Sequence, residues 1–321
     1  MRASKYIVTG GCGFIGSNLV KKLNEEGIKD ITVVDRLGEG EKWKNLKGLS
    51  FSNFVDKEAF RKNVNGGEID GDVEVVFHQG ACTDTTERDG RYMVENNFAY
   101  TRDLIEWSSD VGARLIYASS AAVYGKSRCF DASGSDNLSP VNKYGLSKLL
   151  VDNYVDAYAD HLDTTVLGLR YFNVYGPGEG HKGEMASMVR KMTDQVRAGE
   201  PIRLFEGTDG FADGEQKRDF VHVDDVCRAN IFAARTDVDS GVINVGTGRA
   251  CSFNELAEII FENLRRTGIE YIPFPDELDG KYQSYTEASL DGLHEMGYDQ
   301  SFLSVEEGIS RYCDYLAGEA S

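Results

Sequence analysis

A glycine-rich turn near the start of the chain limits the possible folds more than any other stretch. The letters TGGCGFIG at positions 9–16 follow a short apolar run and precede residues with helical apolar periodicity. Residues without side chains let a backbone approach a pyrophosphate, and the free N–H groups and dipole at a helix start favour its charge. Gly10, Gly13 and Gly16 therefore predict a strand–turn–helix unit that binds a dinucleotide.

The first half of the chain alternates short β-rich apolar runs with helical stretches. This alternation predicts an α/β fold with a Rossmann-like, doubly wound parallel sheet. We expect strands at 6–9, 31–35, 73–78, 115–119 and 165–171, and helices at 15–26, 97–111 and 144–158.

Beyond residue 171 glycine-rich loops interrupt this alternation of strands and helices. Residues 219–226 and 242–246 again have strand-like composition. We therefore expect a smaller α/β substrate domain that is interleaved with the first domain. The dinucleotide-binding domain is expected to comprise residues 1–173, 220–247 and 282–296, and the substrate domain residues 174–219, 248–281 and 297–321.

Charge and cysteine content narrow the function. The chain carries 35 Lys and Arg against 53 Asp and Glu, a formal net charge of −18, which argues against binding a nucleic-acid backbone. The six cysteines lie apart without a C-x-x-C pair, so we expect reduced thiols and no metal site. There is neither a long apolar run nor a signal-peptide pattern, so a cytoplasmic protein without a membrane partner is expected.

The residues after the second expected strand bear on the choice of cofactor. Asp35 ends this strand 19 residues after Gly16, where an acid can accept hydrogen bonds from an adenosine ribose. Arg36 follows directly and Lys42 lies nearby, which supplies the cations that a 2′-phosphate requires. NADP is therefore the predicted cofactor, and Asp35 is also compatible with NAD.

The stretch KYGLSK contains a candidate acid–base pair. Tyr144 and Lys148 have the spacing that places two side chains on one face of a helix. A free tyrosine titrates at about 10, so a base near neutrality needs roughly 4 kcal/mol of phenolate stabilisation. A cation about 4 Å away supplies roughly that at an effective dielectric of about 20, so Lys148 is expected to tune Tyr144. Ser119 and Ser120, in YASSAAVYG, lie where a doubly wound sheet binds ligands and can orient a substrate oxygen.

Taken in order, these motifs resemble the extended short-chain dehydrogenase/reductase family. The resemblance rests on the glycine turn, Asp35, YASSAAVYG, YGLSK and RYFNVYGP, and it covers nearly the whole chain. Longer stretches are similar to one branch of that family, the ADP-L-glycero-D-manno-heptose 6-epimerases. They are FHQGACTDTTERDG, RYFNVYGPGEGHKGEMAS, LFEG, KRDFVHVDDV and YIPFPDELDGKYQ.

This resemblance implies an isomerase that interconverts two ADP-heptoses differing at C6″, a sugar of bacterial surface polysaccharide. It implies a transient C6″ ketone, reduced again on its other face after it rotates. Two proton-transfer groups are implied, Tyr144 and Lys182, while Lys148 positions the cofactor and Ser120 bonds the substrate. It also implies a homo-oligomer.

The resemblance further implies two sets of binding residues. Those for the cofactor are Gly10, Gly13, Phe14, Ile15, Gly16, Asp35, Arg36, Lys42, Lys57, Gln79, Gly80, Ala81, Cys82, Asn96, Tyr144, Lys148, Val174 and Lys182. Those for the substrate are Ser119, Ser120, Asn173, Glu184, Lys191, Phe205, Glu206, Gly207, Thr208, Arg218 and Tyr282. Arg218 also has an independent rationale, since an arginine suits a diphosphate.

Departures from the family pattern leave alternatives open. Gln79 replaces the usual glutamate, TDGFADGEQ before Lys217 is longer than usual, and Gly38 and Glu39 alter the cofactor loop. A nucleotide-sugar epimerase acting at C4 would carry the same tyrosine and lysine, and a catalytically silent NADP-binding sensor would carry the same fold. A 4,6-dehydratase fits less well, because Ala121 and Ala122 occupy positions where those relatives place acids.

Overall fold

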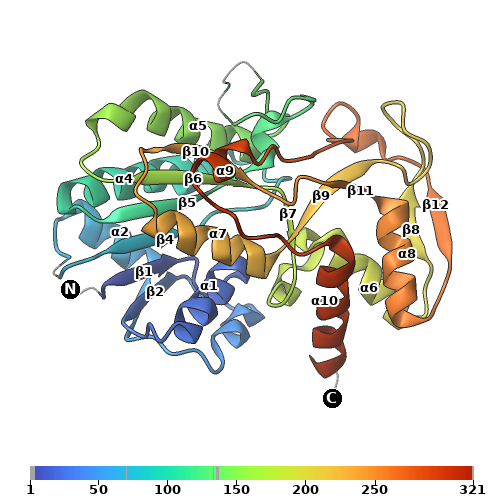
Figure 1. The fold of residues 1–321 in the computed structure, drawn as a ribbon, viewed down its shortest axis with the longest axis horizontal. Coiled ribbons are helices and arrows are strands. Elements are labelled where there is room, and N and C mark those ends of the chain that lie inside the picture. Colours follow the sequence, from blue (N-terminus) through green and yellow to red (C-terminus); the bar gives the residue numbers. More distant parts are fainter. Residues whose placement is uncertain (1–3, 70, 133, 135–136, 320–321) are drawn as a thin grey trace.

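A parallel sheet forms the centre of the molecule. The computed structural model describes residues 4–69, 71–132, 134 and 137–319, and within them this sheet has seven strands in the order β10-β6-β5-β4-β1-β2-β3 (Figure 1). Every neighbouring pair in it is parallel. Its strands are β1 (Tyr6–Thr9), β2 (Ile31–Asp35), β3 (Asn53–Asp56), β4 (Val75–His78), β5 (Arg114–Ser120), β6 (Val166–Tyr171) and β10 (Gly241–Val245).

Helices cover both faces of this sheet, as a doubly wound fold requires. In the described part of the chain, no helix combines the length and the apolar character needed to cross a bilayer. One face carries α1 (Phe14–Glu25) and α7 (Val223–Arg235), and the other carries α2 (Lys57–Asn65), α4 (Tyr100–Val111) and α5 (Lys143–Tyr158) (Figure 1).

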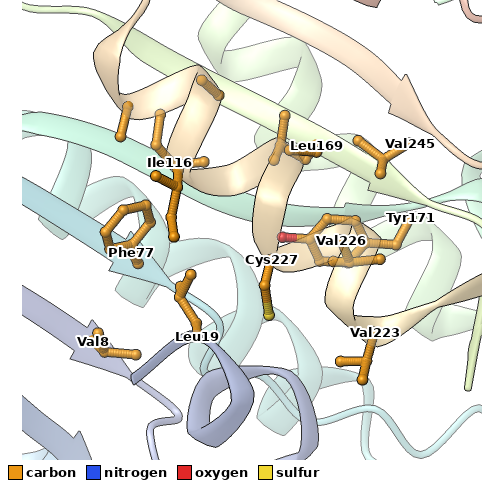
Figure 2. Packing of buried hydrophobic residues seen from close by; sticks show 14 of the residues in the cluster. Val8, Leu19, Phe77, Ile116, Leu169, Tyr171, Val223, Val226, Cys227 and Val245 are labelled. Atoms are coloured by element: carbon orange, nitrogen blue, oxygen red, sulfur yellow. The ribbon is translucent and has the colours of Figure 1, made fainter. Parts of the chain in front are cut away.

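Alternation along the strands creates the two cores. Side chains of successive strand residues point to opposite faces, so Val8 of β1 faces α1 and α7 while Ile7 faces α2 and α4. Figure 2 shows Leu19 of α1 and Cys227 of α7 beside strand residues such as Phe77. Each core is thus a separate apolar layer, and the sheet is buried on both sides.

A smaller lobe lies beside the carboxyl end of the sheet, at the right of Figure 1. In it, β9 (Lys217–His222) pairs with β7 (Asn173–Tyr175) and β11 (Ala250–Ser252), and β8 (Ile202–Phe205) pairs with β12 (Ile269–Ile272). Its apolar core includes α6 (Met188–Ala198), α8 (Phe253–Leu264) and α10 (Val305–Glu319). The short elements of the chain are η1 (Glu41–Leu46), α3 (Gly90–Met93), η2 (Val94–Ala99), η3 (Ala121–Tyr124), η4 (Ala159–His161), η5 (Gly180–Met185), η6 (Asp276–Leu278) and α9 (Asp291–Glu295).

The expected sheet is confirmed, and three local expectations are corrected. The strand expected at 219–226 ends at His222, because the His222 ring accepts a hydrogen bond from the Asp224 amide at 3.2 Å and so caps α7. The helix expected at 97–111 begins with the π-helical turn η2. Edge strand β3 was missed, since it is short and alternates half-buried with exposed residues.

A buried ion pair joins α5 to the sheet. Arg170 Nε donates to Asp152 Oδ2 at 2.8 Å, and both side chains are at most 3% exposed. The other carboxylate contacts are hydroxyl groups, Tyr117 at 3.0 Å and Ser119 at 2.9 Å. Arg170 also donates to the hydroxyl of Tyr124 at 3.1 Å. The pair therefore locks the helix that carries Tyr144 against β5 and β6.

Replacing Asp152→Ala should lower the free energy of unfolding by about 3–5 kcal/mol, because Arg170 would stay buried without its counter-charge. Urea unfolding measures this. The matched control is Arg203→Ala, which breaks the half-exposed pair with Glu270 at 3.1 Å and should cost less than about 1 kcal/mol. Equal small losses in both variants would show that the buried pair does not hold α5.

Candidate active site

The glycine turn between β1 and α1 forms a backbone cradle. Gly10 has a φ of +66°, and a Cβ atom on Gly16 would lie 2.2 Å from the Gly10 carbonyl oxygen, so neither position accepts a side chain. Gly13 caps α1 without any side-chain hydrogen bond to the first turn. Amides at such a helix start suit an anion, so the cradle fits the pyrophosphate of a dinucleotide.

The cradle opens into a cavity of about 510 Å³ at the carboxyl edge of the sheet. Of the predicted cofactor residues, Gly10, Gly13, Phe14, Ile15, Gly16, Asp35, Arg36, Lys42, Lys57, Gln79, Gly80, Ala81, Cys82, Asn96 and Lys182 line it. Tyr144, Lys148 and Val174 are not among its lining residues. Sequence reasoning missed Thr9, Val34, Thr83, Asp84, Tyr92, Tyr100, His181 and Met185.

Asp35 lies at the end of β2 with both carboxylate oxygens engaged. One accepts the amide of Cys12 at 2.8 Å, and the other accepts the Lys42 ammonium at 2.5 Å and the Arg36 amide at 2.6 Å. The Arg36 side chain is exposed at the cavity wall. The acid that a ribose would contact is therefore oriented, and two cations lie beside it.

The ring of His78, at the end of β4, is hydrogen-bonded to Thr9 of β1 and to Thr101 of α4, and the donor of each bond can be assigned. The Thr101 hydroxyl donates its one hydrogen to the Asn97 carbonyl at 2.5 Å, so it accepts from His78 Nε2–H at 2.9 Å. In the neutral ring Nδ1 is then an acceptor, so the Thr9 hydroxyl donates to it at 2.6 Å while its oxygen accepts from the Gly80 amide at 3.2 Å. Burial, with a smaller effect of Lys148, lowers the pKa of His78 to about 3. This neutral ring has a single tautomer, and it fixes Gly80 against the glycine turn.

The π-helical turn η2 supplies the opposite wall. Asn97 accepts from the Cys82 amide at 2.8 Å, and it donates to the Cys82 carbonyl at 2.9 Å and to Ser147 of α5 at 3.0 Å. Its neighbour Asn96 accepts from the Lys57 ammonium at 2.7 Å. π-turns interrupt a regular helix and recur at functional sites. Here Asn96 lines the cavity, while buried Asn97 holds Cys82 of the cavity wall.

The candidate catalytic groups come from β5 and α5. Tyr144 lies near Ser120, the last residue of β5, and this hydroxyl favours the ionised form of the phenol. Lys148, one helical turn later, is buried and donates to the Ala118 carbonyl at 2.6 Å. Its ammonium lies 6.0 Å from the centre of the Tyr144 ring. The structure therefore brings the expected serine, tyrosine and lysine together.

The electrostatics of this group differ from the expectation. Burial raises the pKa of Tyr144, which the hydrogen bond from Ser120 opposes. Burial also lowers the pKa of Lys148 to about 8, although the charge of Asp152 acts to raise it. With the ammonium on the Ala118 carbonyl, desolvation outweighs the expected stabilisation of a phenolate by Lys148.

Lys182 lies in η5 on the far side of the cradle. Its ammonium is 5.5 Å from the centre of the Phe14 ring and has no ion-pair partner within 4 Å in the described part of the chain. Burial lowers the pKa of Lys182, and the nearby charge of Glu179 acts in the opposite direction. Buried Glu179 holds this loop, since it accepts from Ser187 Oγ at 2.8 Å and from the Gly176 amide at 3.1 Å.

In the small lobe, the structure assembles Phe205, Arg218 and Tyr282. The Arg218 guanidinium lies 4.8 Å from the centre of the Tyr282 ring, and the rings of Tyr282 and Phe205 are 6.1 Å apart. Arg218 is only 7% exposed, and among the described residues no carboxylate pairs with it. Burial lowers its pKa. A buried cation without a counter-charge fits an anionic ligand such as a diphosphate.

Other predicted substrate residues make contacts within the protein. Ser119 is buried and donates to Asp152, so its hydroxyl is engaged inside the sheet rather than beside Tyr144. Asn173 donates to the Asp219 carbonyl at 3.1 Å. Glu184 and Lys191 pair with one another at 3.4 Å. Glu206, Gly207 and Thr208 follow β8 in the loop that leads to β9. Val174, which was predicted to bind the cofactor, packs against the apolar core.

Comparisons with known proteins agree with this arrangement. Residues 6–246 match the NAD dependent epimerase/dehydratase family. The chain is 50% identical to an ADP-L-glycero-D-manno-heptose-6-epimerase of Alkalilimnicola ehrlichii over 311 residues, 97% of each chain.

Solved structures resemble it over nearly the whole length. An ADP-L-glycero-D-manno-heptose-6-epimerase of Helicobacter pylori superposes with a TM-score of 0.85 at 34% identity, over 98% of this chain and 96% of that one. A UDP-glucose 4-epimerase of Thermus thermophilus in complex with NAD has a TM-score of 0.79 at 27% identity, over 99% of both chains. The chain therefore belongs to the NAD dependent epimerase/dehydratase family, and within it to the group that includes these two ADP-L-glycero-D-manno-heptose-6-epimerases.

Proposed function

We propose that this protein interconverts ADP-D-glycero-β-D-manno-heptose and ADP-L-glycero-β-D-manno-heptose with NADP as its cofactor. The observation that carries the proposal is a second base candidate, half-buried Lys182, which lines the cavity that the glycine cradle opens, in a chain that also brings Tyr144 and Lys148 together on α5. The 50% identity to an enzyme named for this reaction supports the choice of sugar. The chain is further proposed to act as a homo-oligomer, which sedimentation of the purified protein measures.

The residues divide the chemistry among them. A nicotinamide cofactor held on the glycine cradle would supply reversible hydride transfer at C6″. Tyr144 exchanges the proton of the C6″ oxygen in one orientation, and Ser120 holds that oxygen. Lys182 exchanges the proton in the other orientation, and the lowering of its pKa by burial makes this exchange easier. Arg218 binds the diphosphate, so the sugar can turn while the nucleotide stays fixed.

The two proton transfers need two acid–base groups, because the C6″ oxygen changes position between them. A fixed base must lie within about 2.6–3.2 Å of the proton that it removes. Rotation that presents the other face of C6″ moves the oxygen, and one side chain on a rigid helix cannot follow it. Tyr144 on α5 and Lys182 in η5 belong to different elements, which suits two oxygen positions.

Epimerases that act at C4 share the fold, so the substrate must be tested directly. A structure of a UDP-glucose 4-epimerase of Thermotoga maritima with UDP-glucose has a TM-score of 0.80 at 28% identity. We expect NMR of products from a panel of nucleotide sugars to show turnover of ADP-heptose and none of UDP-galactose. The reverse would make the protein a C4 epimerase, and cofactor binding without any turnover would make it a sensor.

Tyr144→Phe and Lys182→Met should each slow epimerisation at saturating substrate by at least about 10²-fold, the lower scale for loss of a general acid or base. Cofactor and substrate affinities should change little, because each substitution keeps a side chain of similar size and removes only its polar group. Single-turnover kinetics with separately measured affinities test this.

The matched control is Lys22→Met, which removes a lysine of α1 that pairs with Glu25 at 3.0 Å and belongs to no predicted site, so it should keep the saturated rate. If Lys182→Met weakens substrate binding and keeps the saturated rate, the two-base mechanism is wrong and Tyr144 handles both protons.

Arg36→Ala should weaken NADP binding by about tenfold or more and leave NAD binding nearly unchanged, because a charged hydrogen bond to the 2′-phosphate is lost. Calorimetry with both cofactors measures the ratio. Lys44→Ala is the control, since Lys44 is a nearby exposed cation that pairs with Glu41 at 2.7 Å and does not line the cavity. Equal losses for both cofactors in Arg36→Ala would reject the contact with the 2′-phosphate.

A further inference from the structure

An arginine outside the groups considered so far is held between two aromatic rings. The Arg128 guanidinium carbon lies 5.2 Å from the centre of the Phe211 ring and 5.1 Å from that of Tyr285. Ring contacts of this kind involve the flat faces of the guanidinium, whose N–H donors lie in its plane. Arg128 thus lies over two aromatic rings, a contact that can leave its N–H donors free for a ligand.

Arg128 and its neighbour Lys126 are both exposed cations. Neither forms an ion pair or a side-chain hydrogen bond with any residue that the structure describes. The cavity that they line also contains the carboxylate of Asp209, which is bonded to Ser284. The N–H donors of both cations are thus available to an anionic ligand at this cavity.

The position of Arg128 connects it to the proposed diphosphate site. Arg128 and Lys126 line a cavity of about 150 Å³ together with Tyr282, the residue whose ring contacts Arg218. Gln283, next to Tyr282, donates to the Gly125 carbonyl at 2.8 Å and so holds this segment against the turn that carries Arg128. The two arginines thus approach Tyr282 from opposite lobes of the protein.

The loop that carries Phe211 is internally ordered, which makes the stack a stable feature. The amide of Gly207 donates to Asp213 Oδ1 at 2.8 Å, and the Phe211 amide donates to the Thr208 carbonyl at 3.0 Å. Asn254 of α8 donates to the Asp213 carbonyl at 2.9 Å. Asp209 of the same loop is bonded to Ser284 across the small cavity. The long TDGFADGEQ segment therefore presents Phe211 to Arg128 from a fixed base.

We propose that Arg128 is a further substrate-binding residue, which donates to a phosphate oxygen of the nucleoside diphosphate opposite Arg218. This rests on the proposed function for the identity of the nucleotide sugar. Phe211 and Tyr285 orient the guanidinium for this contact, so the long loop contributes to affinity without touching the reacting carbon. Arg128 then acts on binding and not on the proton or hydride steps.

The test compares ADP with adenosine, which lacks phosphates, by calorimetry on NADP-saturated protein. Arg128→Gln should weaken ADP by about tenfold or more, the scale of a lost charged hydrogen bond, and leave adenosine within twofold. Phe211→Leu keeps the charge but loosens its orientation, so a smaller loss for ADP alone is expected. Arg203→Gln, at an exposed arginine paired with Glu270, should change neither ligand.

A purely structural role of Arg128 would weaken both ligands equally, and that result, or an unchanged ADP affinity, overturns the proposal. With ADP-heptose as substrate, Arg128→Gln should raise KM by a similar factor and leave kcat within twofold. A wild-type protein that does not turn over ADP-heptose would contradict the proposed function. The loss of ADP affinity relative to the loss of adenosine affinity in Arg128→Gln would still decide the role of Arg128.

Discussion

The close approach of α1 to β1 is the constraint on which the site depends. At Gly16 even one methyl group would meet the Gly10 carbonyl oxygen at 2.2 Å, so helix and strand can meet only without side chains. This contact directs the start of α1 at the carboxyl edge of the sheet, where β2 ends in Asp35 and β4 ends in His78. The neutral His78 ring then ties the turn to the wall opposite, because its two nitrogens bond Thr9 and Thr101. The glycine turn, Asp35 and the wall that contains Thr101 are therefore linked by hydrogen bonds.

Two cations removed from water without a counter-charge lie on the ligand side of an acidic protein. The well-buried Arg170 and the partly buried Arg61 are paired with carboxylates. Among the described residues, buried Arg218 and half-buried Lys182 have no carboxylate within ion-pair distance. Keeping such groups without a counter-charge costs folding energy. They are therefore best understood as groups whose partners are the phosphates and the reacting oxygen of a ligand.

The parts of the site that could be predicted from sequence are local. Gly10, Gly13 and Gly16 sit in one turn and Tyr144 and Lys148 in one helix, so spacing alone indicates their chemistry. Contacts between distant segments left no such signal. The bonds of His78 to Thr9 and Thr101 span 69 and 23 residues, and Arg128 meets aromatic rings from the small lobe. Ser119 was placed beside the substrate because it neighbours Ser120, but alternation along β5 turns it toward Asp152. The strand expected at 219–226 was too long, because the helix cap at His222 ends it and the composition of the segment does not indicate that cap.

The most direct measurement follows the hydrogen on C6″. ADP-D-glycero-β-D-manno-heptose labelled with deuterium at C6″ would be incubated with the protein in ordinary water, and the product analysed by NMR and mass spectrometry. Transient oxidation with return of the same hydride predicts an inverted C6″ that keeps nearly all of its deuterium. Replacement of the label by hydrogen from the solvent would contradict it, because C6″ would then have been inverted by removal of a proton.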